Sequence, residues 1–472
     1  MVFSSSIFLF IFLPVVLLGY YVIRKPLRNA FLLIMSLGFY AWGEPKFVFV
    51  MIASILLNYA AGLLIDWTKR TRGLGWQRLA LWLTVAFNLG MLFYYKYADF
   101  TLSVLNRTLG LSLPSLGIVL PIGISFFTFQ GMSYVLDLYM GKVSVQKKLL
   151  NVALYISLFP QLIAGPIVRY SDVNDQIDDR EINVEKFASG VRRFTIGLTK
   201  KVLLANITAQ TVDEIFALLP VSMDVSTAWL GVICYALQIY FDFSGYSDMA
   251  IGLGSMFGFT FLENFNYPYI SRSITEFWRR WHISLSTWFR DYLYIPLGGS
   301  RKGNVYVNLC IVFLATGIWH GAAFTFILWG IWHGVFRLLE RVMQQKGRKF
   351  LTDIPVVNYI YTLLVVLLGW VLFRADSVSY ALQYAGRMFG LVRAGTICYT
   401  FGWFLTPKLL IVLICALIAC VPLKQVFVRT SAWLEQSDIG LTLRNVYTVA
   451  MLVLSVALVM TSTYNPFIYF RF

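Results

Sequence analysis

Histidine is rare in this 472-residue sequence, and its three copies are the most obvious candidates for acid–base chemistry. They are His282 in RRWHISLS, His320 in GIWHGAAF and His333 in GIWHGVF. An unperturbed imidazole titrates near neutrality, and apolar surroundings favour its uncharged form, which can accept a proton. A histidine confined to an apolar segment is more often structural than catalytic, but this grouping favours a general base acting on a hydroxyl.

The three histidines are not equivalent. His320 and His333 are 13 residues apart, or about 220° around one continuous helix, so they cannot act together on it. Gly317 and Gly321 flank His320 and would let another backbone approach, whereas His333 suits an interfacial, structural role. We therefore predict His320 as the base, with His282 brought beside it by tertiary packing.

A polar segment, residues 240–302, stands out in an otherwise apolar chain. Its charged residues are Asp242, Asp248, Glu263, Glu276, Arg279, Arg280, Arg290 and Asp291. A charge at bilayer depth costs about 2.5–3.5 kcal/mol on insertion scales and usually marks a functional pathway. An interfacial helix with its charges in water is the alternative. Glu276 can pair with Arg279 or Arg280 along one helix face, and we expect that pair to be structural.

Six residues of this segment are second-rank candidates for lining a reaction tunnel. Interfacial anchoring or helix pairing would explain each of them equally well. They are Asp242, Tyr246, Trp278, Trp281, Arg290 and Asp291.

The composition predicts an integral membrane protein. Hydrophobic residues make up 58% and charged residues 13%, against roughly 25% charged in soluble domains, and the mean hydropathy is +0.70. The net charge of +16 comes from basic clusters between apolar runs, which is typical of cytoplasmic loops and argues against nucleic-acid binding. The five cysteines are scattered through apolar stretches, which favours apolar fillers and predicts no metal site.

The sequence predicts an all-α, polytopic fold with about eleven apolar segments. One of them, 305–338, would be roughly 50 Å long as a single helix, so it must be tilted, broken or doubled. Basic residues follow the first segment rather than precede it, which disfavours a cleaved signal peptide and predicts an outside N-terminus. The segments are 7–23, 29–43, 47–65, 79–95, 118–139, 149–168, 227–259, 305–338, 356–373, 405–423 and 442–461.

The segment 149–168 is predicted to be re-entrant. Lysines at 142–148 precede it and a basic cluster at 192–201 follows it. If both clusters lie in cytoplasmic loops, the single run between them cannot cross the membrane. Phe159-Pro160 and Gly165-Pro166 supply helix breaks, and such backbone survives at membrane depth only where protein or water satisfies it.

These residues resemble the membrane-bound O-acyltransferase superfamily, and more narrowly its bacterial alginate O-acetylase branch. The resemblance is carried by YFDFSGYSDMAIGLG, ENFNYPYISRSITEFWRRWHISLSTWFRDYLYIPLGG and the later WHG, together with the opening MVFSSSIFLFIFLP and the ending NPFIYFRF. It implies an acyltransferase core with a central tunnel, in which His320 is catalytic and His282 occupies the position of its Asn, Asp or His partner.

The resemblance also implies the reaction. A thioester donor, acetyl-CoA in this branch, would arrive from the cytoplasm, and the acetyl group would pass to an exopolysaccharide through an extracytoplasmic acetyltransferase partner. His320 would remove the hydroxyl proton, while His282 would orient the ring or polarise the carbonyl oxygen; an acetyl-histidine intermediate is the covalent variant. Arg301 and Lys302 could meet a CoA phosphate, although a basic loop explains them better. No tightly bound cofactor is expected.

We expect a single membrane-embedded domain over residues 1–472, with a catalytic core at about 120–345, in a bacterial cytoplasmic membrane and in contact with its lipid. Peptidoglycan O-acetylation, cellulose O-acetylation and D-alanyl transfer to teichoic acid are alternatives within the same superfamily. A transporter is the alternative outside it, because buried charges also mark transport pathways.

Overall fold

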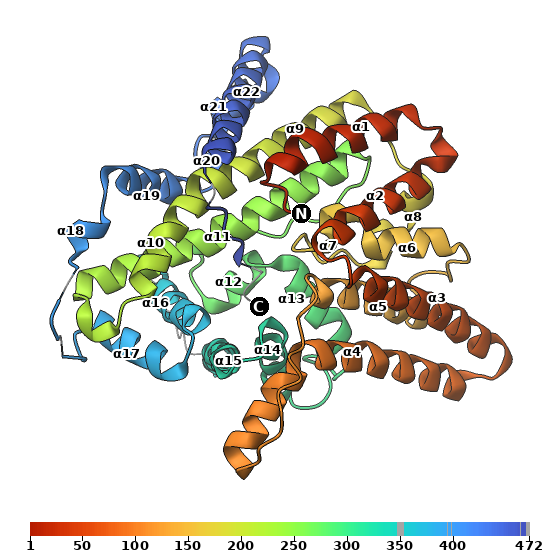
Figure 1. The fold of residues 1–472 in the computed structure, drawn as a ribbon, viewed down its shortest axis with the longest axis horizontal. Helices are drawn as coiled ribbons and strands as arrows, with labels where there is room; N and C mark the ends of the chain where they lie inside the picture. The colour runs from red at the N-terminus through yellow and green to blue at the C-terminus, as the bar shows by residue number, and fades with distance from the viewer. Residues whose placement is uncertain (347–353, 394, 398, 463, 469–472) are drawn as a thin grey trace. The chain divides into compact units, whose positions relative to one another are not determined.

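The computed structural model describes residues 1–346, 354–393, 395–397, 399–462 and 464–468. These residues form helices joined by loops and turns (Figure 1), with one isolated bridge between Met223 and Tyr399 and no β-strand among them. The predicted all-α class is therefore confirmed. The chain divides into two compact units, Met1–Phe194 with Ser247–Leu262, and Thr195–Tyr246 with Glu263–Phe472.

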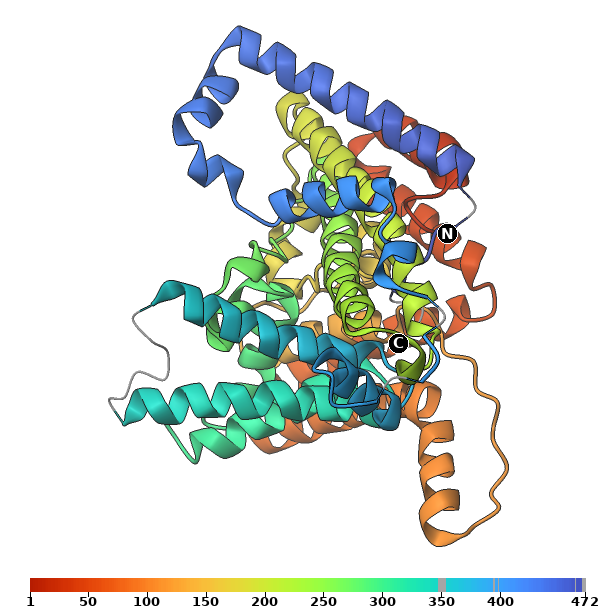
Figure 2. The same cartoon turned by 90° about the vertical axis from the view of Figure 1, so that its left-hand side faces the viewer.

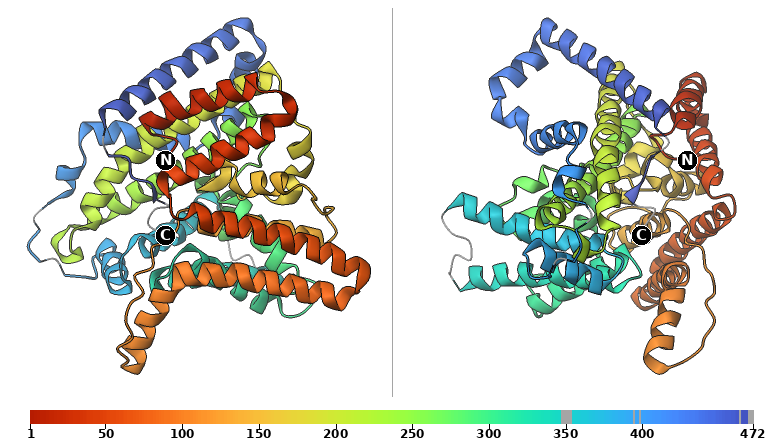
Figure 3. Two further views of the ribbon diagram at one scale, coloured as in Figure 1. Left: turned by 45° about the vertical axis from the view of Figure 1, so that its right-hand side comes forward. Right: turned by 60° about the vertical axis from the view of Figure 1, so that its left-hand side comes forward.

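The first unit is built around helix hairpins. Helices α3 and α4 run antiparallel along each other (Figure 3), α3 also packs on α5, and α2 packs on α6. The bounds of its helices are α1 Leu13–Val22, α2 Arg28–Gly43, α3 Val48–Thr71, α4 Leu74–Leu109, α5 Ile124–Tyr139, α6 Leu149–Ser157, α7 Phe159–Leu162 and α8 Tyr170–Asp178.

Two helices, α9 Val184–Thr199 and α11 Val225–Met256, contribute residues to both units. The second unit contains the antiparallel helices α15 and α16, which pack on each other (Figure 2). The helices that lie wholly in this unit are α10 Asn206–Phe216, α12 Ile274–Arg280, α13 Ile283–Phe289, α14 Val305–His320, α15 Phe324–Gln345, α16 Pro355–Arg374, α17 Val378–Met388, α18 Phe401–Phe404, α19 Pro407–Ala419, α20 Leu423–Val426, α21 Val428–Gln436 and α22 Asp438–Thr461.

Four described helices, α3, α4, α16 and α22, are long and apolar enough to cross a bilayer. They contain the predicted segments 47–65, 79–95, 356–373 and 442–461. Shorter apolar helices cover Phe8–Val22, Val305–His320 and Pro407–Ala419. A helix of 36 residues such as α4 is about 54 Å long, well beyond the roughly 30 Å of hydrocarbon in a bilayer.

The long apolar segment 305–338 is doubled into two helices. Helix α14 ends at His320 and α15 begins at Phe324, and the two pack along each other. Glycines allow this close approach, because a Cβ on Gly317 would lie 2.6 Å from the carbonyl oxygen of Phe326, and one on Gly330 would lie 2.5 Å from that of Phe313. His320 and His333 therefore lie on different helices.

The segment 149–168 is broken where its prolines and glycine predicted. Helix α6 ends at Ser157, Leu158 leaves the helical conformation with ψ 112°, and α7 has only four residues. Nine helical residues, as in α6, extend about 14 Å, too short to cross the hydrocarbon core. Whether this segment returns to the same side of the membrane remains a prediction.

The basic cluster at 192–201 is not a loop, so that part of the charge argument is wrong. Its residues lie within α9 and the π-helical turn η3, Lys200–Ala205. In the first unit, Nη2 of Arg193 lies 2.6 Å from Oδ1 of Asp248 on α11. Arg193 is thus the partner of an acid on a neighbouring helix, and a count of charges in loops cannot detect such a pairing.

The buried core of the second unit contains many aromatic rings, among them Trp281, Trp329 and Trp370. Its other side chains come chiefly from α10, α11, α12, α15, α16, α17 and α19. Such rings bury large areas in fixed edge-to-face or offset arrangements. This core forms the rigid surroundings of the histidines.

Candidate functional site

His282 occupies a strained turn between two short helices. Helix α12 ends at Arg280, α13 begins at Ile283, and His282 between them has φ 44° and ψ 56°. This left-handed conformation costs a non-glycine residue roughly 1–2 kcal/mol. The backbone N–H of Ile283 donates to the carbonyl oxygen of Asn264 at 2.9 Å, which helps to hold the turn. Strain retained in this way is common at functional sites.

Helix α12, which leads into this turn, is fixed from outside by a buried carboxylate. The Glu340 side chain on α15 accepts hydrogen bonds from the N–H groups of Ile274 and Thr275, at 2.7 and 2.9 Å. The first N–H groups of a helix have no acceptor within the helix, so Glu340 supplies the hydrogen-bond acceptors that the start of α12 lacks. At the other end of the helix, Nε of Arg280 lies 2.9 Å from Oε1 of Glu276, as the spacing predicted.

The side chain of His282 is also held in place. Its Nδ1 lies 3.1 Å from Oδ1 of Asn264, and Ser284 donates to the same oxygen through both its backbone N–H and its hydroxyl. The ring packs edge-on against Phe243, with centroids 4.5 Å apart. Nε2 of His282 is buried and has no hydrogen-bond partner. An unpartnered buried atom of this kind calls for an explanation such as a functional role.

His320 is placed by the end of α14 and by three aromatic rings. It is the last residue of that helix, and its side chain is 7% exposed. The ring centroids of Trp319, Trp329 and Phe373 lie 5.0, 4.9 and 5.2 Å from that of His320. Because α14 stops here, the imidazole faces the core of the second unit at a helix end.

The two histidines line one cavity inside the second unit. The free space inside it is small, about 10 Å³, which is roughly the room that one water molecule needs. The imidazoles are the only titratable side chains among the lining residues, and the remaining walls are apolar or aromatic. The lining residues are Ile239, Phe243, Trp281, His282, His320, Trp329, Trp370, Phe373 and Ile468. A mostly apolar pocket with a few convergent polar groups is the usual form of a small-molecule site.

Residues near the C-terminal end of the chain contribute one wall of this cavity. Ile468 lines it, and the N–H of Ile468 donates to Oδ2 of Asp242 at 2.9 Å. Nζ of Lys201 lies 2.7 Å from the other oxygen of Asp242 and also donates to the carbonyl oxygen of Pro466. Asp242 therefore acts on the cavity through Ile468, as an anchor behind its wall.

The other tunnel candidates are distributed unevenly. Trp281 lines the cavity, whereas Tyr246 packs on Phe467, with centroids 5.0 Å apart, and Trp278 packs on Trp329 and His333. The side chains of Tyr246 and Trp278 are therefore not part of this cavity's lining.

Arg290 and Asp291 also lie outside the cavity. They form an ion pair with each other, Nε to Oδ1 at 2.7 Å, and the Arg290 side chain is 57% exposed. They lie in η6, the π-helical turn Arg290–Tyr294 after α13. The structure thus supports the helix-pairing interpretation of these two residues.

His333 is buried in the aromatic core and does not line the cavity. Its side chain is fully buried, and it packs on Phe277, Trp278 and Trp329. In place of an exposed interfacial position, it fills space beside Gly369, where an added Cβ would lie 2.6 Å from Nε2. Both ring nitrogens of His333 are also buried without a hydrogen-bond partner, but unlike His282 it does not line the cavity, and its aromatic surroundings are those of a packing residue.

Sequence reasoning missed several residues of the site. Four lining residues come from outside the polar segment, namely Trp329, Trp370, Phe373 and Ile468. Trp329 lies in α15, at the end of the expected catalytic core, and Trp370 and Phe373 lie in α16, beyond it. No spacing in the sequence relates them to His282. Asn264 could have been suspected, because ENFNYPY is itself a polar stretch within an apolar chain.

The two ligand sets considered from the sequence were a metal site and a basic pair for a CoA phosphate. Among the described residues, no three His, Cys, Asp or Glu side chains form a group that could hold a metal ion. Arg301 and Lys302 lie in an exposed turn before α14.

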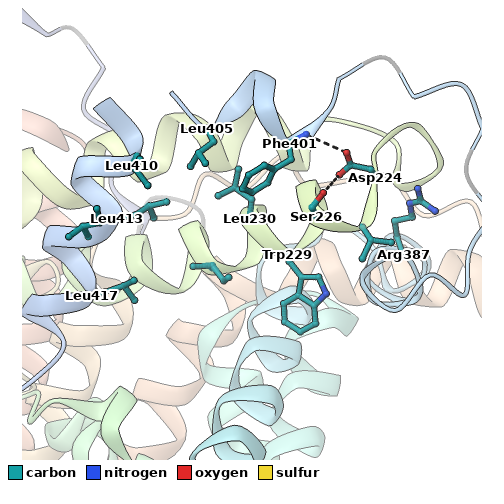
Figure 4. Close-up of a pocket in the computed structure, with 13 residues that line it drawn as sticks. Asp224, Ser226, Trp229, Leu230, Arg387, Phe401, Leu405, Leu410, Leu413 and Leu417 are labelled. Carbon is teal, nitrogen blue, oxygen red and sulfur yellow. Dashed lines mark hydrogen bonds between the residues drawn. The ribbon is translucent and has the colours of Figure 1, made fainter. Parts of the chain in front are cut away.

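A larger cavity elsewhere in the second unit has different chemistry (Figure 4). Leu410, Leu413 and Leu417 of α19 line one side of it, α11 contributes Leu230, and the wall is almost entirely apolar. The carboxylate among its lining residues, Asp224, already accepts hydrogen bonds from Ser226, Thr227 and Phe401. This cavity offers apolar surface and no free catalytic group.

Comparisons with known proteins identify a family for the chain. Residues 143–382 match the membrane-bound O-acyltransferase family. The chain is 45% identical to the probable alginate O-acetylase AlgI of Pseudomonas putida over 82% of this chain and 80% of that protein, and 47% identical to that of Pseudomonas aeruginosa over 82% and 75%. It is 37% identical to the peptidoglycan O-acetyltransferase of Helicobacter pylori, over 83% and 80%. The chain therefore belongs to the membrane-bound O-acyltransferase family.

Proposed function

We propose that this O-acyltransferase moves an acetyl group from cytoplasmic acetyl-CoA across the membrane for the O-acetylation of an extracellular polysaccharide, with alginate as the first candidate. The observation that carries the proposal is the single cavity lined by His282 and His320. The similarity to alginate O-acetylases over most of the chain supports the choice of polymer.

The chemistry follows from a neutral imidazole in apolar surroundings. His320 takes the proton of the acceptor hydroxyl as the hydroxyl oxygen attacks the carbonyl carbon of the thioester. The carbon–sulfur bond then breaks, the acetyl group stays on the oxygen, and the thiolate leaves with the proton that His320 returns. General base catalysis of this kind contributes about 10²–10⁴ in rate. His282 is proposed as the second catalytic residue, because it lines the same cavity.

The cavity walls contribute by excluding water. Trp281, Trp329, Trp370 and Phe373 surround the two imidazoles. Polar interactions are stronger in such surroundings than in water, and a dry site also protects the thioester from hydrolysis. Tyr246, Trp278, Arg290 and Asp291 do not line this cavity and stay second-rank candidates for lining a tunnel that leads to it.

The setting is proposed to be the bacterial cytoplasmic membrane, with the N-terminus outside and the whole chain forming one catalytic domain. Donor and acceptor then approach from opposite faces. An extracytoplasmic acetyltransferase partner would receive the acetyl group and pass it to the polymer.

The test uses purified protein in lipid vesicles with acetyl-labelled acetyl-CoA and a hydroxyl acceptor. The expected result is loss of the thioester together with labelled ester on the acceptor. A transporter would leave the thioester intact, so intact acetyl-CoA with label moved across the membrane would contradict the proposal. O-acetyl analysis of the cell-envelope polymers after gene deletion then identifies the acceptor.

Peptidoglycan is the second candidate acceptor. The relative from Helicobacter pylori is named for that activity and matches over 83% of this chain. Loss of O-acetyl groups from peptidoglycan alone after deletion would favour it over alginate.

A further inference from the structure

The hydrogen bonds around Asn264 determine which nitrogen of His282 carries the proton. The backbone N–H of Ser284 lies 3.2 Å from the side-chain atom Oδ1 of Asn264. A backbone N–H can only donate, so the atom that it meets must be the amide oxygen and not the amide nitrogen. This contact fixes the orientation of the Asn264 side chain, which distance alone leaves open.

The same oxygen faces Nδ1 of His282 at 3.1 Å. An amide oxygen only accepts hydrogen bonds, and a neutral imidazole has one N–H donor and one acceptor nitrogen. The Ser284 hydroxyl also lies 3.4 Å from Nδ1, but its shorter contact, at 2.9 Å, is the one in which it donates to Oδ1 of Asn264. Nδ1 must therefore carry the proton, because two acceptors, Nδ1 and Oδ1 of Asn264, would otherwise face each other inside an apolar core. Nε2 is then the unprotonated nitrogen.

Nε2 is the atom left over for a ligand. It lies on the opposite edge of the ring from the Asn264 contact, is buried, and has no hydrogen-bond partner. His282 itself lines the cavity. Nδ1 of the ring contacts Oδ1 of Asn264 and the Ser284 hydroxyl, and Ser284 in turn holds Asn264 through two hydrogen bonds to the same oxygen. The ring cannot exchange its two edges without losing its contact with Asn264.

We propose that Asn264 is a positioning residue that fixes His282 in the Nδ1–H tautomer and so presents an unprotonated Nε2 to the cavity. This rests on the proposed function, in which the cavity holds the reacting atoms. The consequence for the reaction is specific. Neutral His282 can accept a hydrogen bond or a proton from the acceptor hydroxyl, but it cannot donate a hydrogen bond to the carbonyl oxygen of the thioester.

The position of the proton on His282 distinguishes two possible roles for it, polarising the carbonyl oxygen and accepting from the hydroxyl. Polarising a carbonyl requires an N–H directed at its oxygen, which the Nδ1–H tautomer lacks on its free edge. Accepting from the hydroxyl requires a lone pair there, which this tautomer supplies. The acceptor hydroxyl has one proton, so only one of the two imidazoles takes it in a given turnover. That imidazole returns the proton to the departing thiolate, and His282 is then again in its Nδ1–H tautomer.

Histidine-selective ¹⁵N labelling tests the tautomer directly. The chain has three histidines, so the spectrum of the full-length protein in lipid contains three pairs of ring nitrogens, and His320→Gln and His333→Gln assign the pair of His282 by elimination. At neutral pH the expected result is a protonated Nδ1 and an unprotonated Nε2 for His282. A protonated Nε2 in the wild-type protein would overturn the proposal, whatever the activity.

Variants of Asn264 test its positioning role. Asn264→Leu is expected to lose the defined tautomer and at least tenfold in transfer, whereas Asn264→Asp keeps an acceptor oxygen and is expected to retain both the Nδ1–H signal and most of the transfer. Asn266→Leu is the matched control, since it alters an exposed asparagine of the same segment, and it should behave as wild type.

The outcomes separate this proposal from the proposed function. Full transfer by a folded Asn264→Leu would overturn the positioning role and leave the acyl transfer standing. The expected tautomer in a protein that leaves the thioester intact would overturn the proposed function and leave the assignment of the proton standing.

Discussion

Nζ of Lys201 lies 2.7 Å from Oδ1 of Asp242, and the two side chains are 3% and 1% exposed. The same pair binds the backbone near the chain's C-terminal end, since Lys201 donates to the carbonyl oxygen of Pro466 and Asp242 accepts from the N–H of Ile468. A buried ion pair on η3 and α11 thus fixes the segment that closes one wall of the histidine cavity.

Removal of one member of this pair is predicted to destabilise the protein strongly. Asp242→Leu or Lys201→Met leaves the other charge buried without a partner, which costs about 3–5 kcal/mol. Thermal unfolding in lipid or detergent measures the loss. Arg290→Met is the control, because the Arg290 side chain is 57% exposed and ion pairs of exposed side chains contribute about 0–1 kcal/mol. Equal effects of Asp242→Leu and Arg290→Met would contradict the anchoring role.

The hydrogen bonds that Glu340 accepts at the start of α12 are predicted to support acetyl transfer indirectly, by holding the helix that leads to His282. Glu340→Ala leaves the N–H groups of Ile274 and Thr275 without their acceptor, which costs about 1–3 kcal/mol when they stay buried. Because α12 leads into the His282 turn, initial rates of transfer should fall with stability. Glu340→Gln keeps an acceptor oxygen and should lose less; if it loses as much as Glu340→Ala, these hydrogen bonds are not the reason.

The contact between α14 and α15 is predicted to require glycine at position 317. A Cβ there would lie 2.6 Å from a backbone oxygen, and overpacking of this kind costs about 1–3 kcal/mol. Since α14 ends at His320, transfer should also decline. Gly38→Ala is the matched control, because nothing lies within 4 Å of its added Cβ. A Gly317→Ala variant that unfolds at the wild-type temperature would rule out the tight contact.

The re-entrant course of 149–168 is predicted to leave Ser171 on the cytoplasmic side. Ser171 is exposed, so a cysteine there in an otherwise cysteine-free chain should react with an impermeant reagent applied from the cytoplasm. Labelling from outside alone would contradict a re-entrant segment.

Much of this arrangement follows from local sequence. Apolar runs and low charge predict the membrane helices, the length of 305–338 predicts its division into α14 and α15, and prolines predict the breaks after α6. The three-histidine pattern also picked out the two imidazoles that the structure places at one cavity.

The rest depends on contacts between residues distant in sequence. Lys201 belongs to a basic cluster that looks like a loop, yet its charge meets Asp242 inside the unit. Trp370 and Ile468 line the cavity from far along the chain, and no period or motif relates them to His282. Arg290 and Asp291 are a polar pair in sequence, but they satisfy each other outside the cavity.

The most direct measurement is acetyl transfer from labelled acetyl-CoA by His320→Ala beside the wild-type protein, with His333→Gln as the matched histidine control and thermal unfolding to confirm that all three are folded. Loss of a general base predicts a fall of about 10²–10⁴ in the rate for His320→Ala, with His333→Gln close to wild type. A folded His320→Ala protein that keeps most of its transfer would contradict the account.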